Sequence, residues 1–174
     1  SGNTFTVSPS TDCTVQINFA PSDTGLTDTW DGTAREPVLS QGAYYISTAE
    51  ELAGLAEMVN SGNALANTDI YLLADLDLAG LPWTPIGYYP AGAYYYDDSE
   101  PFSGRFYGGG HVITGLAIGS ADAPYSEHTS TGFFGCVANP DEDQDAVISG
   151  LTIRDAEVYG QGRTGILIGY AWGA

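Results

Sequence analysis

The feature that most constrains this chain is an internal repeat of short apolar segments separated by glycine. Val112-Ile-Thr-Gly-Leu-Ala-Ile118 matches Val147-Ile-Ser-Gly-Leu-Thr-Ile153 almost residue for residue, at an offset of 35. Leu76-Asp-Leu78 is a weaker, earlier copy of the Leu-x-Ile end. Because strands this short cannot bury their own apolar face, neighbouring copies are expected to stack on one another.

Each copy leads into a second apolar block bounded by glycine. The three blocks are Trp83–Gly87, Thr131–Gly135 and Thr164–Gly169. A second matching block at nearly the same offset argues against chance similarity. The glycines are expected at corners, where the chain bends or approaches a neighbouring coil closely. The repeat therefore predicts a mainly β fold, a solenoid in which inward-facing residues form ladders, namely Leu116 and Ile118 with Leu151 and Ile153.

One helix is predicted, over about residues 48–60. Thr48 is a good N-cap, and Glu51 follows at the spacing of a capping box. Asn60-Ser-Gly62 supplies the stop. The apolar residues recur at helical period along one stripe, formed by Leu52, Leu55, Ala56 and Val59.

The first part of the chain lies outside the repeat. Residues 4–8 and 13–19 are predicted to form two short strands joined by the turn-forming stretch 8–12. We expect residues 1–41 to be a strand pair and linker, either a cap or the end of a preceding domain. Residues 42–174 would then form the repeat domain.

The charge excludes several classes of partner. The formal net charge is −18, and the four cations are all arginines, because the chain has no lysine. Nucleic acid and anionic membranes require a basic surface, so neither is expected as a partner. No apolar run reaches membrane-spanning length. An acidic surface suits solubility, cation binding and an extracellular setting.

The order of these elements resembles the bacterial repeat family named for its GLUG motif. The resemblance covers roughly residues 42–174 and is carried by the segments 45–52, 72–78, 83–87, 102–113, 132–135 and 165–169. It implies a right-handed parallel β-helix-like solenoid, with the helix capping its N-terminal end. It also implies an extracellular location on the bacterial cell surface, as in adhesin-like proteins and the non-catalytic regions of immunoglobulin A proteases.

The densest acidic segment is a candidate calcium site. A predicted loop holds four acidic residues within five positions, and carboxylate oxygens are suitable calcium ligands; the four are Asp141, Glu142, Asp143 and Asp145. The segment is no EF-hand, because Ala146 and Thr152 occupy the positions that require glycine and glutamate. A solvated acidic loop and weak Ca2+ binding remain the two interpretations. No other cofactor is expected.

The best candidate for a binding surface is a tyrosine-rich insertion between two repeat strands. It carries five tyrosines, which are Tyr88, Tyr89, Tyr94, Tyr95 and Tyr96. Tyrosine offers ring area and a hydroxyl, which suit sugars and protein interfaces. The alternative is that the loop folds back over the flank of the solenoid.

Other polar residues are expected to be structural. Asp75 and Asp77 face the same way on a strand, but glycoside hydrolysis needs two carboxylates facing each other across a cleft. They are expected to accept backbone hydrogen bonds, and His111 is expected to bond to backbone at a glycine corner. Cys13 and Cys136 are expected to be buried thiols, with a disulfide between them as the alternative.

These features favour a chain that is not an enzyme. The prediction is a non-catalytic cell-surface module of a larger exported protein, which presents loops for adhesion to a host protein or glycan. The alternatives are a carbohydrate-binding module centred on residues 88–96, and part of a polysaccharide-degrading enzyme. The apolar segment 164–172 carries no polar cap, so its edge is expected to continue into further repeats or to pack on another chain.

Overall fold

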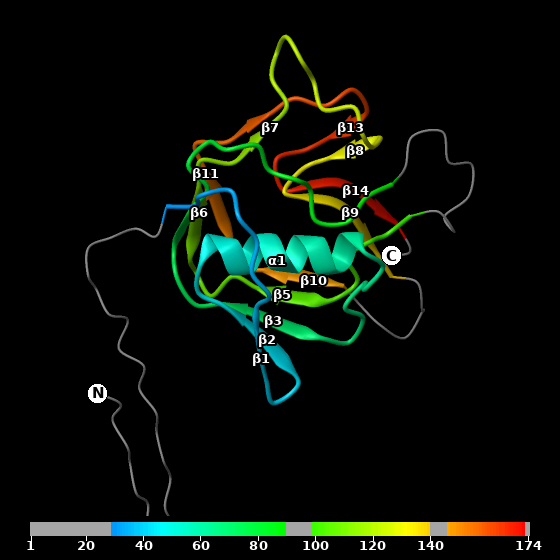
Figure 1. The fold of residues 1–174 in the computed structure, drawn as a ribbon. Helices are drawn as coiled ribbons and strands as arrows, with labels where there is room; N and C mark the ends of the chain where they lie inside the picture. The colour runs from blue at the N-terminus through cyan, green and yellow to red at the C-terminus, as the bar shows by residue number, and fades with distance from the viewer. Residues whose placement is uncertain (1–28, 90–98, 140–145, 173–174) are drawn as a thin grey trace, which may run out of the picture.

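The computed structural model describes residues 29–89, 99–139 and 146–172, and shows a mainly β protein with one helix (Figure 1). The two strands predicted over residues 4–8 and 13–19 lie outside the described residues. The fold class is therefore confirmed at the level of a mainly β protein built from several sheets.

The elements alternate short strands with tight corners. The helix is α1 (Ala49–Asn60). The strands are β1 (Val38–Ser40), β2 (Ala43–Ile46), β3 (Asp69–Leu72), β4 (Leu76–Asp77), β5 (Arg105–Tyr107), β6 (Val112–Thr114), β7 (Ala117–Ile118), β8 (Ser130–Thr131), β9 (Phe134–Ala138), β10 (Val147–Ser149), β11 (Thr152–Arg154), β12 (Glu157–Val158), β13 (Arg163–Thr164) and β14 (Ile168–Trp172).

The largest sheet has the strand order β1-β2-β3-β5-β10. Strands β1 and β2 form an antiparallel hairpin, and every other neighbour in the sheet is parallel. The hairpin turns at Gln41 and Gly42, whose φ angles are 51° and 81°. Such left-handed backbone favours glycine at the second position. The parallel pairs align Ile70 with Phe106, and Phe106 with Ile148.

Four smaller parallel sheets are built in the same way from segments far apart in the chain. Their orders are β11-β6-β4, β12-β7, β13-β8 and β14-β9. We call residues 105–138 the middle pass and residues 146–172 the last pass, since each visits all five sheets in turn. Each strand of the last pass lies at the edge of its sheet among the described residues.

The structure corrects the register of the sequence repeat. Val112 was expected to match Val147, but Val112 pairs with Thr152 and Val147 pairs with Arg105. The predicted ladders are therefore wrong in their partners, because Ile153 aligns with Ile113 and Val158 with Ile118. In the same way, Leu76 aligns with Ile113 rather than with Leu116.

The physical reason is that the two similar segments specify the same corner at different places. In each, a strand runs into a glycine with left-handed backbone, Gly115 at φ 69° and Gly150 at φ 64°, and a second strand follows. In the middle pass this corner joins β6 to β7, and in the last pass it joins β10 to β11. The sequence pattern encodes local geometry and not the pairing between passes.

The second set of blocks is aligned as predicted. Ile86 forms a parallel bridge with Phe134, and Phe134 aligns with Ile168 in the β9–β14 pair. The rings of Trp83 and Phe133 stack with centroids 5.6 Å apart and planes 8° apart. The ladder Ile86–Phe134–Ile168 therefore connects three successive copies.

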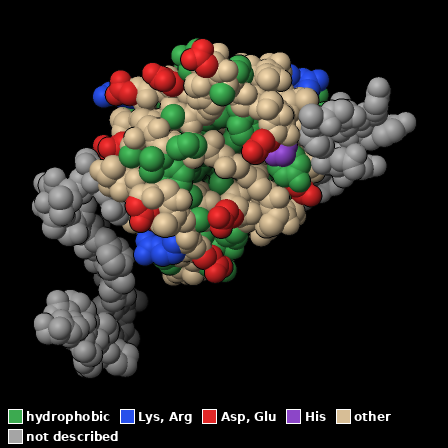
Figure 2. All heavy atoms as spheres, turned by 45° about the horizontal axis from the view of Figure 1, so that its top comes forward, with side chains coloured by type: hydrophobic (Ala, Val, Ile, Leu, Met, Phe, Trp, Pro, Cys, Tyr) green, Lys and Arg blue, Asp and Glu red, His purple; other side chains and the backbone are tan. Residues whose placement is uncertain are grey.

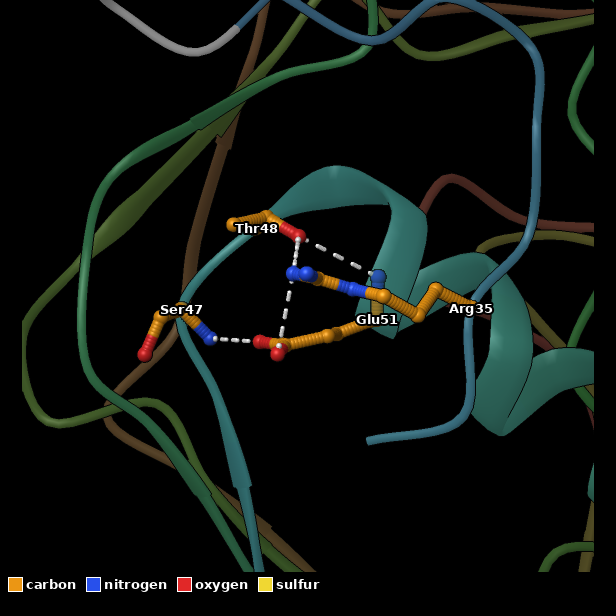
Figure 3. A network of polar contacts seen from close by, with 4 residues as sticks. All are labelled: Arg35, Ser47, Thr48 and Glu51. Atoms are coloured by element: carbon orange, nitrogen blue, oxygen red, sulfur yellow. Dashed lines mark hydrogen bonds and ion pairs between the residues drawn. The ribbon is translucent and has the colours of Figure 1, made fainter. Parts of the chain in front are cut away.

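The helix and its N-cap are confirmed (Figure 3). The Thr48 hydroxyl accepts a hydrogen bond from the Glu51 backbone N–H, at 3.4 Å. The Glu51 carboxylate reaches back to accept from the Ser47 N–H at 2.8 Å, and it pairs with Arg35 at 3.1 Å. All four residues of the predicted apolar stripe are buried, namely Leu52, Leu55, Ala56 and Val59.

The core lies between α1 and the parallel sheets (Figure 1). Trp30 joins it, with its ring edge-on to Trp83 at 5.5 Å. Since Thr29 bridges Asp77 and β1 pairs with β2, residues 29–41 pack against the same body as the repeat.

Candidate functional site

The first two tyrosines of the predicted insertion belong to a cluster of aromatic and cationic side chains. Tyr88 and Tyr89 lie at the base of the insertion, while Tyr94, Tyr95 and Tyr96 lie outside the described residues. The lateral cluster, as we call it, consists of Tyr88, Tyr89, Tyr125, His128, Arg163 and Tyr170.

Backbone hydrogen bonds hold the base of the insertion. Tyr88 and Glu100 form an antiparallel bridge, with N···O distances of 2.8 and 3.0 Å. The Thr129 N–H donates to the Tyr89 carbonyl at 3.0 Å, and the Arg163 N–H donates to the Thr129 carbonyl at 2.8 Å. Tyr89, Thr129 and Arg163 thus lie side by side on three successive segments of the chain.

The side chains of the lateral cluster form two groups, one of Tyr88, His128 and Tyr125 and one of Tyr89, Tyr170 and Arg163. Tyr88 stacks on His128 with centroids 4.2 Å apart and planes 10° apart. The guanidinium carbon of Arg163 lies 4.2 Å from the ring centroid of Tyr170 and 5.6 Å from that of Tyr89. Those two tyrosines meet edge to face at 5.7 Å. The two distances from the Arg163 guanidinium to the tyrosine rings fall within the range of a cation–π interaction.

The electrostatics of the lateral cluster leave Arg163 as its permanent cation. Burial lowers the pKa of His128 below its ordinary value, so the imidazole is neutral at neutral pH. Burial also raises the pKa of Tyr125, with a further contribution from Glu127, whose carboxylate accepts the Tyr125 hydroxyl at 3.3 Å. The cluster therefore offers one guanidinium and neutral ring surface, with the Glu127 carboxylate beside Tyr125.

A second aromatic group, which the sequence reasoning missed, lies on the five-stranded sheet. Tyr45, Tyr71 and Tyr107 are aligned across β2, β3 and β5, with ring centroids 5.5 and 5.2 Å apart and planes about 20° apart. Because each ring stacks on the next, the faces between them are occupied. The row stabilises the sheet as cross-strand pairs do, by roughly 0.2–1 kcal/mol a pair.

The carboxylates that could have suggested catalysis have structural partners. Asp75 accepts from the Val112 N–H at 2.9 Å, and Asp77 accepts from the Ala79 N–H at 2.9 Å. Their predicted backbone bonding is confirmed. His111 bonds to backbone at the glycine corner as predicted, since its N–H donates to the Gly108 carbonyl at 2.9 Å. Its ring Nδ1 also contacts the Asp75 carboxylate, at 3.1 Å.

A groove of about 410 Å³ lies along α1, and its lining includes Trp30, Trp83, Asn60 and Glu57. The Asn60 side chain is committed to backbone, because it donates to the Pro85 carbonyl and accepts from the Gly87 N–H. Glu57 is the one carboxylate in the lining. Among the described residues, the lining holds no second carboxylate to face Glu57.

The proposed calcium ligands Asp141, Glu142, Asp143 and Asp145 lie outside the described residues. Among the residues that the structure does describe, no group of three or more His, Cys, Asp or Glu side chains is placed to hold a metal ion. Figure 2 shows acidic side chains scattered over the face turned to the viewer rather than gathered in one patch.

Cys136 is a buried free thiol, as the favoured interpretation of that residue predicted, and Cys13 lies outside the described part of the chain. Burial raises the pKa of Cys136 to about 11. The thiol is therefore protonated at neutral pH and is a poor nucleophile.

No helix in the described part of the chain has the length and apolar character needed to cross a membrane. In comparisons with known proteins, no family model, no curated protein and no solved structure matches this chain.

Proposed function

We propose that this chain is a non-catalytic module of a larger right-handed parallel β-helix-like solenoid, which presents lateral loops for binding at the bacterial cell surface. The parallel pairing supports the architecture, since all five sheets join equivalent segments of successive passes in the same order. The resemblance to the GLUG-motif repeats supports the setting.

The observation that carries the proposal is the contrast between aligned residues of the two passes. Phe106, Ile113 and Ile118 of the middle pass are fully buried. Their aligned partners in the last pass, Ile148, Ile153 and Val158, are only partly buried, and Ile166 is 54% exposed. Apolar residues are thus only partly covered along one side of the five sheets. A further pass or another chain that stacked on this side would bury them.

The test is to add a pass. A second copy of residues 139–172 is fused after Ala174 of the full chain. We expect one cooperative unfolding transition, and a free energy of unfolding higher by about 2 kcal/mol or more, the value of burying one large apolar side chain. Hydrogen exchange in β10–β14 should slow.

The matched control carries the same extension with Ile153→Asp and Ile168→Asp in the added copy alone. We expect this control to leave the exchange of β10–β14 as it is in the unextended chain. If the unaltered extension also leaves it unchanged, the proposed stacking is wrong.

A carbohydrate-binding module is the second candidate. The lateral cluster supports it, because ring surface, hydroxyls and one guanidinium lie together beside the predicted tyrosine insertion. This candidate is compatible with the first, since a solenoid can carry a glycan site on its flank.

A further inference from the structure

Within the described part of the chain, two of the four arginines are paired with carboxylates. Arg35 pairs with Glu51, and Arg105 pairs with Asp69. Arg163 is exposed, makes no ion pair with any described residue, and lies instead on the rings of Tyr170 and Tyr89. With 22 Asp and Glu residues against four cations, a guanidinium held on rings is available to an external anion.

The position of Arg163 is fixed by close backbone packing. Its N–H donates to the Thr129 carbonyl at 2.8 Å, and the residue before it is Gly162. A Cβ at Gly162 would come within 2.2 Å of the Thr129 oxygen, so only glycine permits this approach. The guanidinium is thus presented from a firmly seated strand, β13, whereas an arginine on a loose loop would lose more entropy on binding.

We infer that Arg163, Tyr89 and Tyr170 of the lateral cluster bind a saccharide that carries a carboxylate, and that Arg163 is the anion-binding residue. A planar guanidinium that lies against a ring keeps N–H donors in its own plane, and these match the two oxygens of a carboxylate. The rings of Tyr89 and Tyr170 beside it supply apolar area for the sugar ring. The inference rests on the proposed function in one respect, that the lateral loops bind ligands.

The charge of the cluster further restricts the class of ligand that it fits. Sulfated polysaccharides and phosphorylated ligands are recognised by several basic residues together. Here one guanidinium is present on the rings of Tyr89 and Tyr170. Burial lowers the pKa of His128, and Glu127, beside Tyr125 in the other group, adds a negative charge, so neither residue supplies a second cation. One permanent cation suits a singly charged carboxylate, as in a uronic acid or a sialic acid.

The test is a calorimetric or NMR titration of the full chain at 0.15 M salt. The Debye length there is about 8 Å, which screens repulsion from distant carboxylates. The probes are trigalacturonate and 3′-sialyllactose, with galactotriose and lactose as their neutral counterparts, and an aspartate-rich peptide. We expect at least one acidic saccharide to bind about tenfold or more tightly than its neutral counterpart, and the two acidic probes separate the two sources of the carboxylate.

Arg163→Gln should weaken this binding by about tenfold or more, which is the usual value of a charge-assisted hydrogen bond. Arg163→Lys keeps the charge and should recover part of the binding. The matched control is Arg154→Gln, which removes the same charge from an exposed position on β11 and should change the dissociation constant less than twofold.

Three results would overturn the inference: no acidic saccharide binds, the neutral sugars bind equally well, or the aspartate-rich peptide alone binds. An equal loss in Arg163→Gln and Arg154→Gln would overturn it as well. If Arg163→Gln fails to fold, Arg163→Lys and the comparison of probes on the unaltered chain still decide. None of these results bears on the added-pass experiment, so the two proposals fail separately.

Discussion

The two ends of the stacked strands are finished in different ways. At the first end, β1 pairs with the edge of β2, and α1 packs its apolar stripe onto the core, so Ile46 and Leu52 are fully buried. At the last pass, no described strand pairs with the far edges of β10–β14. Ile148, Ile153 and Ile168 remain partly exposed there.

This difference teaches where burial comes from in such a fold. Ile113 and Ile153 are the same residue type, and they are aligned in one parallel pair. Ile113 is fully buried because strands lie on both sides of it, β4 and β11, whereas Ile153 has a neighbour on one side. A residue in a stacked sheet is therefore buried by the next pass as well as by its own contacts.

The largest effect that would test the comparison is expected from Ile113→Ala. The free energy of unfolding should fall by about 3–4 kcal/mol, the usual cost of removing a buried aliphatic side chain together with the cavity it leaves. Ile153→Ala should cost about half as much, because water already reaches that side chain. Urea denaturation of both variants measures the difference.

Equal losses in these two variants would contradict the contrast between the passes. They would mean that Ile153 is covered in solution, for example by a second copy of the chain. Sedimentation at several concentrations distinguishes that cause.

The alignment of the middle pass with the last pass shows how far the sequence could predict the fold. The strands, the glycine corners and the alignment of Ile86, Phe134 and Ile168 follow from composition and spacing. The register of the first repeat block could not be predicted in this way. The match between residues 112–118 and 147–153 shows that both segments form the same kind of corner, and it does not show that they pair with each other. The corner that such a segment occupies within a pass depends on the lengths of the loops between strands, and a local motif does not encode those lengths.

A substitution at the first end, which β1 and α1 cover, should have the next largest effect on the free energy of unfolding. Glu51→Ala removes a buried carboxylate that accepts from the Ser47 N–H and pairs with Arg35. We expect a loss of about 2 kcal/mol, the usual value of a hydrogen bond to a charged group. Glu50→Ala, at the neighbouring and more exposed position, is the control and should change the free energy of unfolding by less than about 0.5 kcal/mol.

The two corners of the repeat allow a smaller and more local test. Gly115 and Gly150 share left-handed backbone, but a Cβ at Gly115 would lie 3.0 Å from the Gly80 nitrogen, and one at Gly150 would lie 3.3 Å from its nearest neighbour. Alanine at either position should cost about 1–2 kcal/mol for the backbone alone. We expect Gly115→Ala to be the worse of the two in thermal unfolding, because it is covered by passes on both sides. If Gly150→Ala were the more destabilising of the two, steric crowding around the glycine would not explain the difference between the corners.

The lateral cluster shows what sequence reasoning could and could not find about the site. The run of tyrosines drew attention to Tyr88 and Tyr89, because tyrosine-rich loops commonly bind ligands. Arg163, Tyr170 and His128 lie 39 or more residues further along and share no motif with them. Only the pairing of segments 89, 129 and 163 brings these side chains together, so a correct register would have been the one signal available.

The smallest expected effect concerns Asp75, which links two passes by accepting from the Val112 N–H. That hydrogen bond, and then the contact with His111, lower the pKa of Asp75 below the ordinary value of 3.8. A carboxylate whose pKa is depressed in the folded state stabilises the protein above its unfolded pKa, and the contribution is lost as the pH falls from about 4 through the folded pKa. Because the side chain is 67% exposed, solvent screening limits the effect to a fraction of a kcal/mol.

Asp75→Asn should therefore lower the free energy of unfolding slightly at pH 7 and flatten its decline as the pH falls below about 4. Asp122→Asn, at an exposed position in the loop after β7, is the control and should reproduce the decline of the unaltered chain. Urea titrations across this range measure both. If the two variants behave alike, the Asp75 bond adds nothing to the contact between passes, and the stack is held by its apolar ladders and backbone pairing alone.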